Sequence, residues 1–368
     1  KEEEKEKEKE KGEEEKEEKE KEKREIEELT VDDFDLIKVI GKGTLGKTLH
    51  VRRKDEVFKE EKESENNEGH YAMKVMDHPV SLRDPYQFWT KKTTLLELRH
   101  PFLVSYHHCF HTVNKMYFVM DYVRGGQLYN YLLKERQFTE DTTRFYSAEI
   151  FCGVEYLHEN GVVFRNLKPE NVLLTKEGHV RLTDYGPLLE VDDQLANQDR
   201  MNINATPEYL APEILEGLPF EKSADWWSFG IMLFEMLVGL PPFYSQDVQV
   251  MYTKILSGKI KFPDNIGKEA KDLIEQLLIT NPKERLTDPN IIKDHFFFVK
   301  ISDWDKLAAR EYEPPIVPKV KTAINDTEID PIFTSEWIDP DPDPPIEPFV
   351  FDPFYPETTY CPPGPFGY

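Results

Sequence analysis

Two short stretches of the chain carry residues that could move a phosphoryl group. The segment VVFRNLKPENVLL, residues 162–174, places Lys168 and Asn171 three positions apart, and Asp184 follows in TDYG. A cation that contacts phosphate oxygens, with an amide and a carboxylate that share Mg²⁺, is the set that phosphoryl transfer from a nucleotide requires. The residue types and their order therefore predict a phosphotransferase site.

A glycine-rich segment upstream would complete that site. GKGTLG, residues 41–46, has the spacing of a phosphate-binding loop, in which missing side chains let backbone N–H groups approach a polyanion. The same spacing occurs in ordinary hairpin turns, so the loop alone is a weak signal. Lys74 follows in the strand-like segment YAMK and supplies a second cation for the phosphates. Together these features favour the phosphate-binding interpretation.

The elements that would position these residues change character along the chain. From residue 31, alternating apolar residues and β-branched side chains predict strands joined by a glycine turn, and HYAMKVM and MYFVMDY predict two more. These two strands bracket a helical stretch, TKKTTLLELRH. Beyond residue 125 the helical period dominates, and SADWWSFGIMLFEMLVGLPPF is apolar on nearly every face, as in a buried central helix. We expect a small, mainly β lobe followed by a mainly α lobe.

The negative charge of the chain lies in its extensions. Of the formal net charge of −24, about −6 belongs to residues 1–28, about −4 to residues 54–69 and about −10 to residues 311–368. The Glu/Lys head, residues 1–28, has almost no apolar residues to pack against a core, Ile26 being the exception, and is expected to be disordered. The rest is close to neutral, which argues against nucleic-acid binding through a basic face.

Three features bear on location. Three scattered cysteines, Cys109, Cys152 and Cys361, do not form a disulfide or zinc pattern, so we expect a reducing, cytoplasmic compartment. The longest apolar run, IMLFEMLVGLPPF, is broken by Glu235 and two prolines, and no direct membrane insertion is expected. The chain begins KEEEKEKEKEKGEEE without an initiator Met or a signal peptide, which favours a fragment or an artificial sequence.

The combined motifs resemble those of the protein kinases over roughly residues 31–355. Gly41, Gly43 and Gly46 match the glycine-rich loop, Lys74 matches VAIK, Lys168 and Asn171 match the catalytic loop, and Asp184 matches DFG. Residues 211–213 match APE. Asp225 and Arg285 match two scaffold residues of the family, and Arg285 would be the partner of Glu213. RHPFL, FVMDYVRGGQL, ATPEYLAP, ADWWSFG and FDPF resemble the AGC group and, within it, the protein kinase B (Akt) subfamily.

The resemblance implies a bilobed α+β protein kinase fold that binds ATP and Mg²⁺. It implies a β-rich N-lobe at residues 29–120, a mainly α-helical C-lobe at residues 121–300, and an AGC-type tail at residues 301–368 that returns over the N-lobe. Asn171 and Asp184 would be the metal ligands. The residues implied to bind ATP are Gly41, Gly43, Gly46, Thr48, Ala72, Lys74, Met120, Asp121, Val123 and Asn171.

The resemblance also implies a substrate and an assembly state. The partner would be a basic Ser/Thr peptide or protein, contacted by Glu170 and Glu235, whereas Gln127 stands where the family has a third glutamate. The loss of that charge should weaken peptide binding. A monomer is expected.

One departure falls in the catalytic loop. Asn166 stands where the family has the aspartate that accepts the proton of the substrate hydroxyl. An amide can hydrogen-bond to that hydroxyl but cannot take its proton. General acid–base help is worth roughly 10²- to 10⁴-fold, and kinase catalysis rests largely on positioning and electrostatics. We therefore expect strongly impaired turnover, with residual transfer.

A second departure concerns the partner of Lys74. Counted back from RHPFL, the position of the family's pairing glutamate holds Lys91. Two lysines within about 4 Å would repel by about 4 kcal/mol at an effective dielectric of about 20. Without nucleotide between them, we expect the helix that carries Lys91 to adopt an inactive-like position.

Other departures concern regulation. Asn202 replaces the phosphorylated threonine of the activation segment, and Asp343 replaces the turn-motif threonine with a permanent charge. Phe351 and Phe354 match the hydrophobic motif, but Tyr355 follows them instead of Ser or Thr. Three interpretations stay open: a working kinase, a pseudokinase-like module that binds nucleotide, and an artificial rewrite of a kinase scaffold. His107, His108 and His111 have metal-like spacing but no evident acidic partner, so we expect structural roles.

Overall fold

A five-stranded antiparallel sheet forms the N-terminal part of the molecule. The computed structural model describes residues 29–43, 46–54, 69–77, 94–112, 115–185, 206–219 and 221–319. After the short helix η1 (Val31–Asp33), the strands are β1 (Phe34–Gly43), β2 (Gly46–Arg53), β3 (His70–Asp77), β4 (Tyr106–His111) and β5 (Lys115–Asp121). Their order across the sheet is β1-β2-β3-β5-β4. The predicted β lobe is confirmed.

The two faces of this sheet have different characters because side chains alternate along a strand. One face packs into a small separate core, made of Phe34, Val39, Leu49, Val51, Met73, Tyr117 and Val119. The intervening positions of β2 and β3 lie on the other face, where Thr48 is opposite Lys74 and His50 is opposite Ala72. This second face therefore carries the predicted site residues of the sheet.

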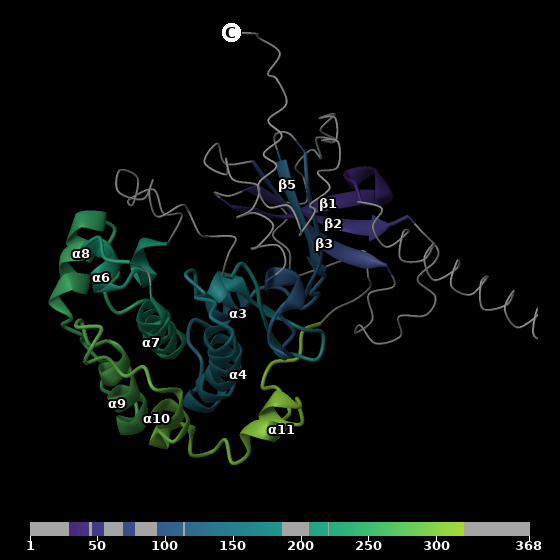
Figure 1. Ribbon diagram of the computed structural model, residues 1–368. Helices are drawn as coiled ribbons and strands as arrows, with labels where there is room; N and C mark the ends of the chain where they lie inside the picture. The colour runs from purple at the N-terminus through teal and green to yellow at the C-terminus, as the bar shows by residue number, and fades with distance from the viewer. Residues whose placement is uncertain are drawn as a thin grey trace, which may run out of the picture.

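Helices make up most of the regular structure after β5 (Figure 1). They are α3 (Leu128–Glu135), α4 (Glu140–Glu159), α6 (Pro212–Leu215), α7 (Lys222–Val238), α8 (Val248–Ser257), α9 (Lys268–Leu277), α10 (Pro289–Lys293) and α11 (Trp304–Ala308). Short helices are η2 (Pro169–Asn171), η5 (Pro207–Tyr209) and η6 (Phe296–Phe298), and β6 (Val172–Leu174) pairs with β7 (Val180–Leu182). Figure 1 shows the helices gathered below and to the left of the sheet, and α3 is the labelled helix nearest to it.

The predicted central helix is α7, and the structure confirms its burial. Trp226, Trp227 and Phe229 are fully enclosed, and the helix packs against α4 and α9. It ends at Gly239, whose φ of 88° favours glycine, and a Cβ there would lie 2.0 Å from the Arg136 carbonyl oxygen. Burial of several aromatic side chains makes this helix the core of the second lobe.

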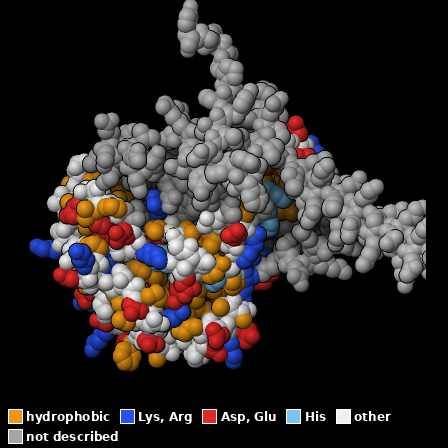
Figure 2. All heavy atoms as spheres, viewed as in Figure 1, with side chains coloured by type: hydrophobic (Ala, Val, Ile, Leu, Met, Phe, Trp, Pro, Cys, Tyr) orange, Lys and Arg blue, Asp and Glu red, His pale blue; other side chains and the backbone are white. Residues whose placement is uncertain are grey.

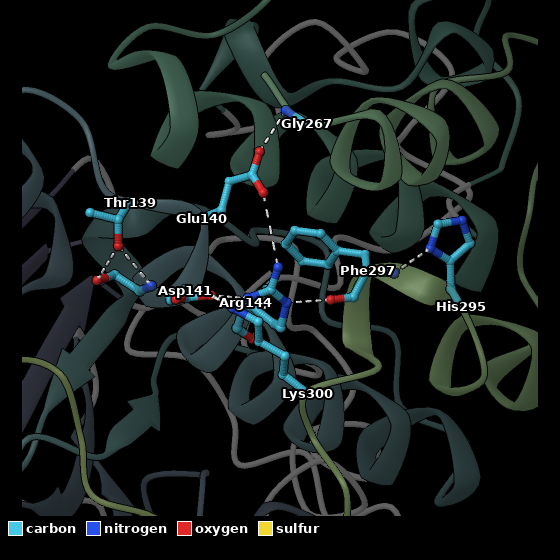
Figure 3. A network of polar contacts seen from close by, with 10 residues as sticks. Thr139, Glu140, Asp141, Arg144, Gly267, His295, Phe297 and Lys300 are labelled. Carbon is cyan, nitrogen blue, oxygen red and sulfur yellow. Dashed lines mark hydrogen bonds and ion pairs between the residues drawn. The ribbon is translucent and has the colours of Figure 1, made fainter. Parts of the chain in front are cut away.

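The first turn of α4 is tied to the C-terminal helices by a polar network (Figure 3). Thr139 caps the helix by accepting a hydrogen bond from the Thr142 backbone N–H. Arg144 donates to the Phe297 carbonyl and to Asp141, and its guanidinium lies 5.0 Å from the Phe297 ring centre. This network fixes α4, which in turn supports the loop that comes after it.

The chain beyond α11 lies against the helical lobe as far as it is described. The Tyr146 hydroxyl donates to the Ile316 carbonyl at 3.4 Å. Gly178 has a φ of 102°, and a Cβ there would meet the Ile316 carbonyl oxygen at 2.0 Å. Residues 309–319 form neither helix nor strand, as their proline content predicts. The return of the tail over the N-lobe concerns residues outside the described ones.

Two further predictions concern helices. Residues 94–97, within the predicted stretch TKKTTLLELRH, are helical, and Leu95 and Leu98 near them are buried. Across the residues that the structure describes, no helix combines the length and the apolar character needed to span a membrane.

Candidate functional site

A buried carboxylate of α7 fixes the loop that precedes η2. Asp225 accepts hydrogen bonds from the backbone N–H groups of Phe164, at 2.7 Å, and of Arg165, at 2.8 Å. Its side chain also contacts His158 Nε2 at 2.7 Å. Arg165 has a φ of 71°, a conformation that side chains rarely adopt and that the surrounding contacts must enforce. Asp225 therefore sets the shape of the loop.

Three predicted site residues lie further along this loop. The Asn171 side-chain N–H donates to the Asn166 carbonyl at 2.7 Å, which leaves the Asn171 carbonyl oxygen as its potential ligand atom. Lys168 Nζ donates to the Thr206 hydroxyl at 2.6 Å. Asn166 and Lys168 are each half-buried, so both side chains are accessible to a ligand.

Lys74 and Asp184 meet across the two lobes. Lys74 Nζ lies 2.7 Å from Asp184 Oδ1, although the residues belong to β3 and to the segment after β7. The lysine is buried, whereas the carboxylate side chain keeps 26% of its exposure. Asp184 has a φ of 58°, a second strained conformation at this site. The structure thus brings together a cation and a carboxylate predicted to act on one phosphate group.

Tyr185, the next residue, anchors the backbone at Asp184 through its buried side chain. Its hydroxyl donates to the Val104 carbonyl at 2.7 Å, and its ring packs edge-on against Tyr106 at 5.6 Å. The ring also lies 6.1 Å from that of Phe164, in the loop fixed by Asp225. A buried aromatic hydroxyl needs a hydrogen-bond partner, and the Val104 carbonyl supplies it.

The glycines at the turn between β1 and β2 have different constraints. Gly43 pairs with Gly46 at the end of the hairpin. Gly46 has a φ of 143°, and a Cβ there would lie 2.0 Å from the Val75 carbonyl oxygen, so close approach to β3 requires glycine. Gly41 faces Thr48 at an ordinary 3.6 Å. For Gly46, strand packing is therefore a sufficient reason for glycine.

The residues predicted to surround the adenine lie on β2, β3 and the end of β5. Ala72 is opposite Met120, and both are buried. The Thr183 hydroxyl points to Met120 Sδ at 3.9 Å. We call residues 121–123, which lead from β5 toward α3, the hinge. Its Val123 is half-buried and packs against the main core.

The side chain of the hinge residue Asp121 forms hydrogen bonds with His107 and Ser105. His107 Nε2 lies 2.7 Å from Asp121 Oδ1, and the Ser105 N–H donates to Oδ2 at 3.0 Å. Burial would raise the pKa of Asp121, but the His107 hydrogen bond and nearby charges outweigh it and lower the pKa overall. The expectation that His107 has no acidic partner was therefore wrong. A register shift in β4 turns His107 toward the neighbouring strand.

Two of the predicted peptide-binding carboxylates lie in one acidic group. Glu235 is buried and accepts a hydrogen bond from the Tyr209 hydroxyl. Burial raises its pKa to about 7. The Tyr209 hydrogen bond opposes this rise, and repulsion from Glu170 and Glu208 adds to it. One buried oxygen each of Glu170 and Glu208 has no hydrogen-bond donor among the described residues. Such a group can accept a cationic side chain.

The third predicted peptide contact lies beside this group. Gln127 precedes α3 and forms a bridge with Leu173 of β6, while α3 packs against η2, which contains Glu170. The residues predicted to be regulatory, Lys91, Asn202, Asp343, Phe351 and Phe354, fall outside the described residues. The predicted partnership of Arg285 with Glu213 is confirmed, with two hydrogen bonds of 2.6 and 2.8 Å.

Sequence reasoning missed two residues of the site. Thr206 contacts Lys168, and Glu208 adds charge beside Glu235. Both belong to ATPEYLAP, which we used only as a group signature. The sequence signal that could have identified them is a hydroxyl and a carboxylate within ATPEYLAP, the segment that the structure places beside the catalytic loop.

Comparison with known proteins agrees with this geometry. Residues 34–297 match the family of the protein kinase domain. The chain is 46% identical over 318 residues to a RAC family serine/threonine-protein kinase homolog of Dictyostelium discoideum, covering 85% of this chain and 68% of that protein. It is 43% identical over 312 residues to the serine/threonine-protein kinase Sgk1 of Danio rerio, with shares of 83% and 68%.

A third relative covers more of this chain. The RAC serine/threonine-protein kinase of Drosophila melanogaster is 37% identical over 344 residues, which are 91% of this chain and 54% of that protein. The chain thus spans between about half and two thirds of the length of these relatives. The match of residues 34–297 includes the loop, the ion pair and the acidic group described above. The chain belongs to the protein kinase family and is a serine/threonine kinase domain of its AGC group.

Proposed function

We propose that this chain binds Mg·ATP and transfers the γ-phosphoryl group to serine or threonine in basic peptides, slowly because Asn166 replaces the usual base. The observation that carries the proposal is the 2.7 Å contact of Lys74 with Asp184, next to a loop that presents Lys168 and Asn171. A cation, a carboxylate and an amide then converge where phosphates and their metal would bind.

The donor set suits Mg²⁺. The ion prefers oxygen ligands, and the Asp184 carboxylate and the side-chain carbonyl oxygen of Asn171 are of that kind. When bound, Mg²⁺ would neutralise charge on the phosphates. Lys74 would share the Asp184 carboxylate with the metal and contact the phosphate oxygens. The β1–β2 turn at Gly41, Gly43 and Gly46 would cover the phosphates.

The adenine would lie between the sheet and the hinge. Thr48, Ala72 and Met120 offer apolar surface, and the backbone of Asp121 and Val123 offers hydrogen-bonding groups. The Asp121 side chain contacts His107 and Ser105, and the Asp121 backbone N–H donates to the Ser105 carbonyl at 3.1 Å, so its backbone carbonyl would be the group that contacts the base.

The residues that would face the substrate hydroxyl explain why slow phosphoryl transfer is expected. Lys168, held by Thr206, would stabilise negative charge on the transferred group, and Asn166 would orient the hydroxyl. The amide cannot take the hydroxyl proton, so the general-base part of the acceleration, roughly 10²- to 10⁴-fold, is lost. Positioning remains, and residual transfer is expected.

The acidic group would select the peptide. Glu170, Glu208 and Glu235 provide unpaired or buried oxygens that an arginine side chain can satisfy with several N–H donors. Gln127 would contribute a hydrogen bond without charge. The substrate class is therefore a basic peptide with a serine or threonine acceptor.

Regulation and organisation form part of the same proposal. Asn202 would prevent activation by phosphorylation of the loop, Asp343 would act as a fixed charge, and Phe351 with Phe354 would dock the tail. Lys91 would repel Lys74 until nucleotide binds. The lobes would divide at residues 29–120 and 121–300, with the tail at 301–368. We place the protein in the cytoplasm as a monomer, consistent with the buried thiols of Cys109 and Cys152.

The surface charge fits a protein substrate rather than a nucleic acid. Figure 2 shows Lys and Arg side chains interspersed with Asp and Glu over the described part of this face. An extended basic stripe would be the expected footprint for a phosphate backbone.

A second candidate function is that of a nucleotide-binding module without transfer. Asn166 is the observation that favours it. The two functions share the nucleotide site and differ only in turnover.

Single-turnover transfer separates them. Radiolabelled Mg·ATP would be mixed with excess protein and an arginine-rich serine peptide, for the unmodified chain and for Asn166→Asp. We expect slow transfer by the first and an increase of about 10²-fold or more in the second. No transfer by either would overturn the kinase proposal, and rapid transfer by the unmodified chain would overturn the predicted impairment.

A further inference from the structure

A pair of buried histidines lies behind the hinge. His50 of β2 and His70 of β3 share a hydrogen bond between His50 Nε2 and His70 Nδ1, 2.9 Å apart. His50 has no exposed surface, and its other ring nitrogen, Nδ1, has no partner among the described residues. Leaving a buried ring nitrogen unpaired is costly. An apolar side chain could fill the position of His50 in β2, so packing alone does not explain a histidine there.

The ring of His50 stacks on the hinge. Its centre lies 3.9 Å from that of Tyr122, and the two ring planes differ by 13°. Tyr122 is buried and lies between Asp121 and Val123, the residues whose backbone would contact the adenine. His50 is also opposite Ala72, which is opposite Met120. The histidine pair therefore borders the proposed adenine site on its hinge side.

The stacked ring is uncharged. Burial, followed by the charges of His70, Lys38 and Arg124, lowers the pKa of His50 to about 3. A neutral imidazole can stack on the tyrosine without the cost of a buried charge. Its orientation is then set by the hydrogen bond to His70, in the next strand.

A third histidine contacts the hinge from β4, which lies on the other side of β5 from β3. His107 of β4 lies 2.7 Å from the Asp121 carboxylate, and its ring packs edge-on against Tyr71 at 5.4 Å. Asp121 also accepts from the Ser105 N–H, and the Ser105 carbonyl accepts from the Asp121 N–H at 3.1 Å. The side chains of two consecutive hinge residues are thus each in contact with a histidine from a different strand.

We infer that His50, supported by His70, and His107 are positioning residues that fix the hinge for adenine recognition. The inference rests on the proposed nucleotide function. It assigns to the three histidines an effect on the base and none on the phosphates, because Lys74 and Asp184, the proposed phosphate-binding residues, are held by their contact with each other.

Two sets of variants test it. His50→Leu removes the ring and the hydrogen bond, whereas His50→Phe keeps a ring that can stack on Tyr122. His107→Phe and His108→Phe are a matched pair: the residues are adjacent on β4, but only His107 contacts Asp121, while His108 lies 3.5 Å from Arg53. Thermal melting of each variant verifies that the protein is folded.

The first measurement is displacement of a fluorescent ATP analogue by adenosine and by magnesium tripolyphosphate. His50→Leu is expected to weaken adenosine binding about 2- to 10-fold, the range that one aromatic pair supports, and to leave tripolyphosphate binding unchanged. His50→Phe should bind adenosine within about twofold of the original chain, since stacking is retained. His107→Phe should weaken adenosine binding and His108→Phe should not.

The second measurement needs no ligand. Amide hydrogen exchange at residues 121–123 should be faster in His50→Leu and His107→Phe than in the original chain and in His108→Phe. Unchanged exchange and unchanged adenosine affinity in both variants would overturn the inference and leave nucleotide binding intact. An original chain that binds neither ATP nor adenosine would overturn the proposed function, and the exchange result would still decide whether the histidines fix the hinge. Equal losses for adenosine and tripolyphosphate would indicate general damage and also overturn the inference.

Discussion

Lys74 Nζ lies 2.7 Å from Asp184 Oδ1, so the buried ammonium of the sheet has as its partner the carboxylate that is proposed to bind Mg²⁺. The two side chains retain 7% and 26% of their exposure. A buried cation needs a partner, and under the proposed function this partner would also bind the metal of the nucleotide. Stability and nucleotide binding would then be coupled through one carboxylate.

Removal of that carboxylate should destabilise the fold through the lysine it leaves behind. Asp184→Ala is expected to cost about 3 kcal/mol of unfolding free energy, the low end for a broken buried pair, because Asp184 is partly exposed. Lys74→Met in the same chain should recover part of this loss. Urea unfolding of both single variants and the double variant measures the coupling. Strictly additive losses would contradict the argument.

The same carboxylate should control the response to nucleotide. Millimolar Mg·ATP should raise the melting temperature of the original chain by preferential binding to the folded state, and Asp184→Ala should abolish the rise. Asp264→Ala removes an exposed carboxylate far from the ion pair in sequence and serves as the control. A rise that persists in Asp184→Ala would show that Asp184 is not needed for nucleotide binding.

Much of this arrangement can be predicted from local patterns. Alternation predicts the strands, the apolar period predicts α7, and the order of Lys74, Asn171 and Asp184 predicts a shared site, because these signals depend on residues close in sequence. Contacts such as that of Lys168 with Thr206 depend on how a distant segment returns, which no local period encodes. The contact of His107 with Asp121 depends on a register shift in β4, and alternation alone cannot predict such a shift.

The anchor of the catalytic loop gives a third prediction. Asp225→Asn keeps the shape of the side chain but replaces one oxygen by an N–H donor, so the N–H of Phe164 or of Arg165 loses its acceptor. The expected cost is about 1–3 kcal/mol of unfolding free energy. Asp272→Asn, at an exposed carboxylate that contacts His295, should change it by less than about 0.5 kcal/mol. Urea unfolding compares the two, and equal effects would contradict an anchoring role.

Glu235 should make peptide binding depend on pH. Burial raises its pKa to about 7, so the carboxylate is mostly protonated at pH 6 and mostly charged at pH 8. Arginine in the peptide stays charged throughout. Because the folded pKa exceeds the ordinary value of 4.5, the protonated form stabilises the fold at low pH, and this contribution is lost as the pH rises through about 7. The charge that favours peptide binding appears at the upper end of this change, between about pH 6 and pH 8.

Affinity for an arginine-rich peptide without histidine should therefore rise between pH 6 and pH 8, by up to about tenfold if only the charged form of Glu235 binds. Glu235→Gln should reduce that rise to less than about twofold and weaken binding at pH 8. Glu159→Gln, at an exposed glutamate at the end of α4, is the control. Fluorescence anisotropy of a labelled peptide gives the affinities. A rise of equal size in Glu235→Gln would assign the pH dependence to another group, because the proton that opposes the peptide would then not be bound to this carboxylate.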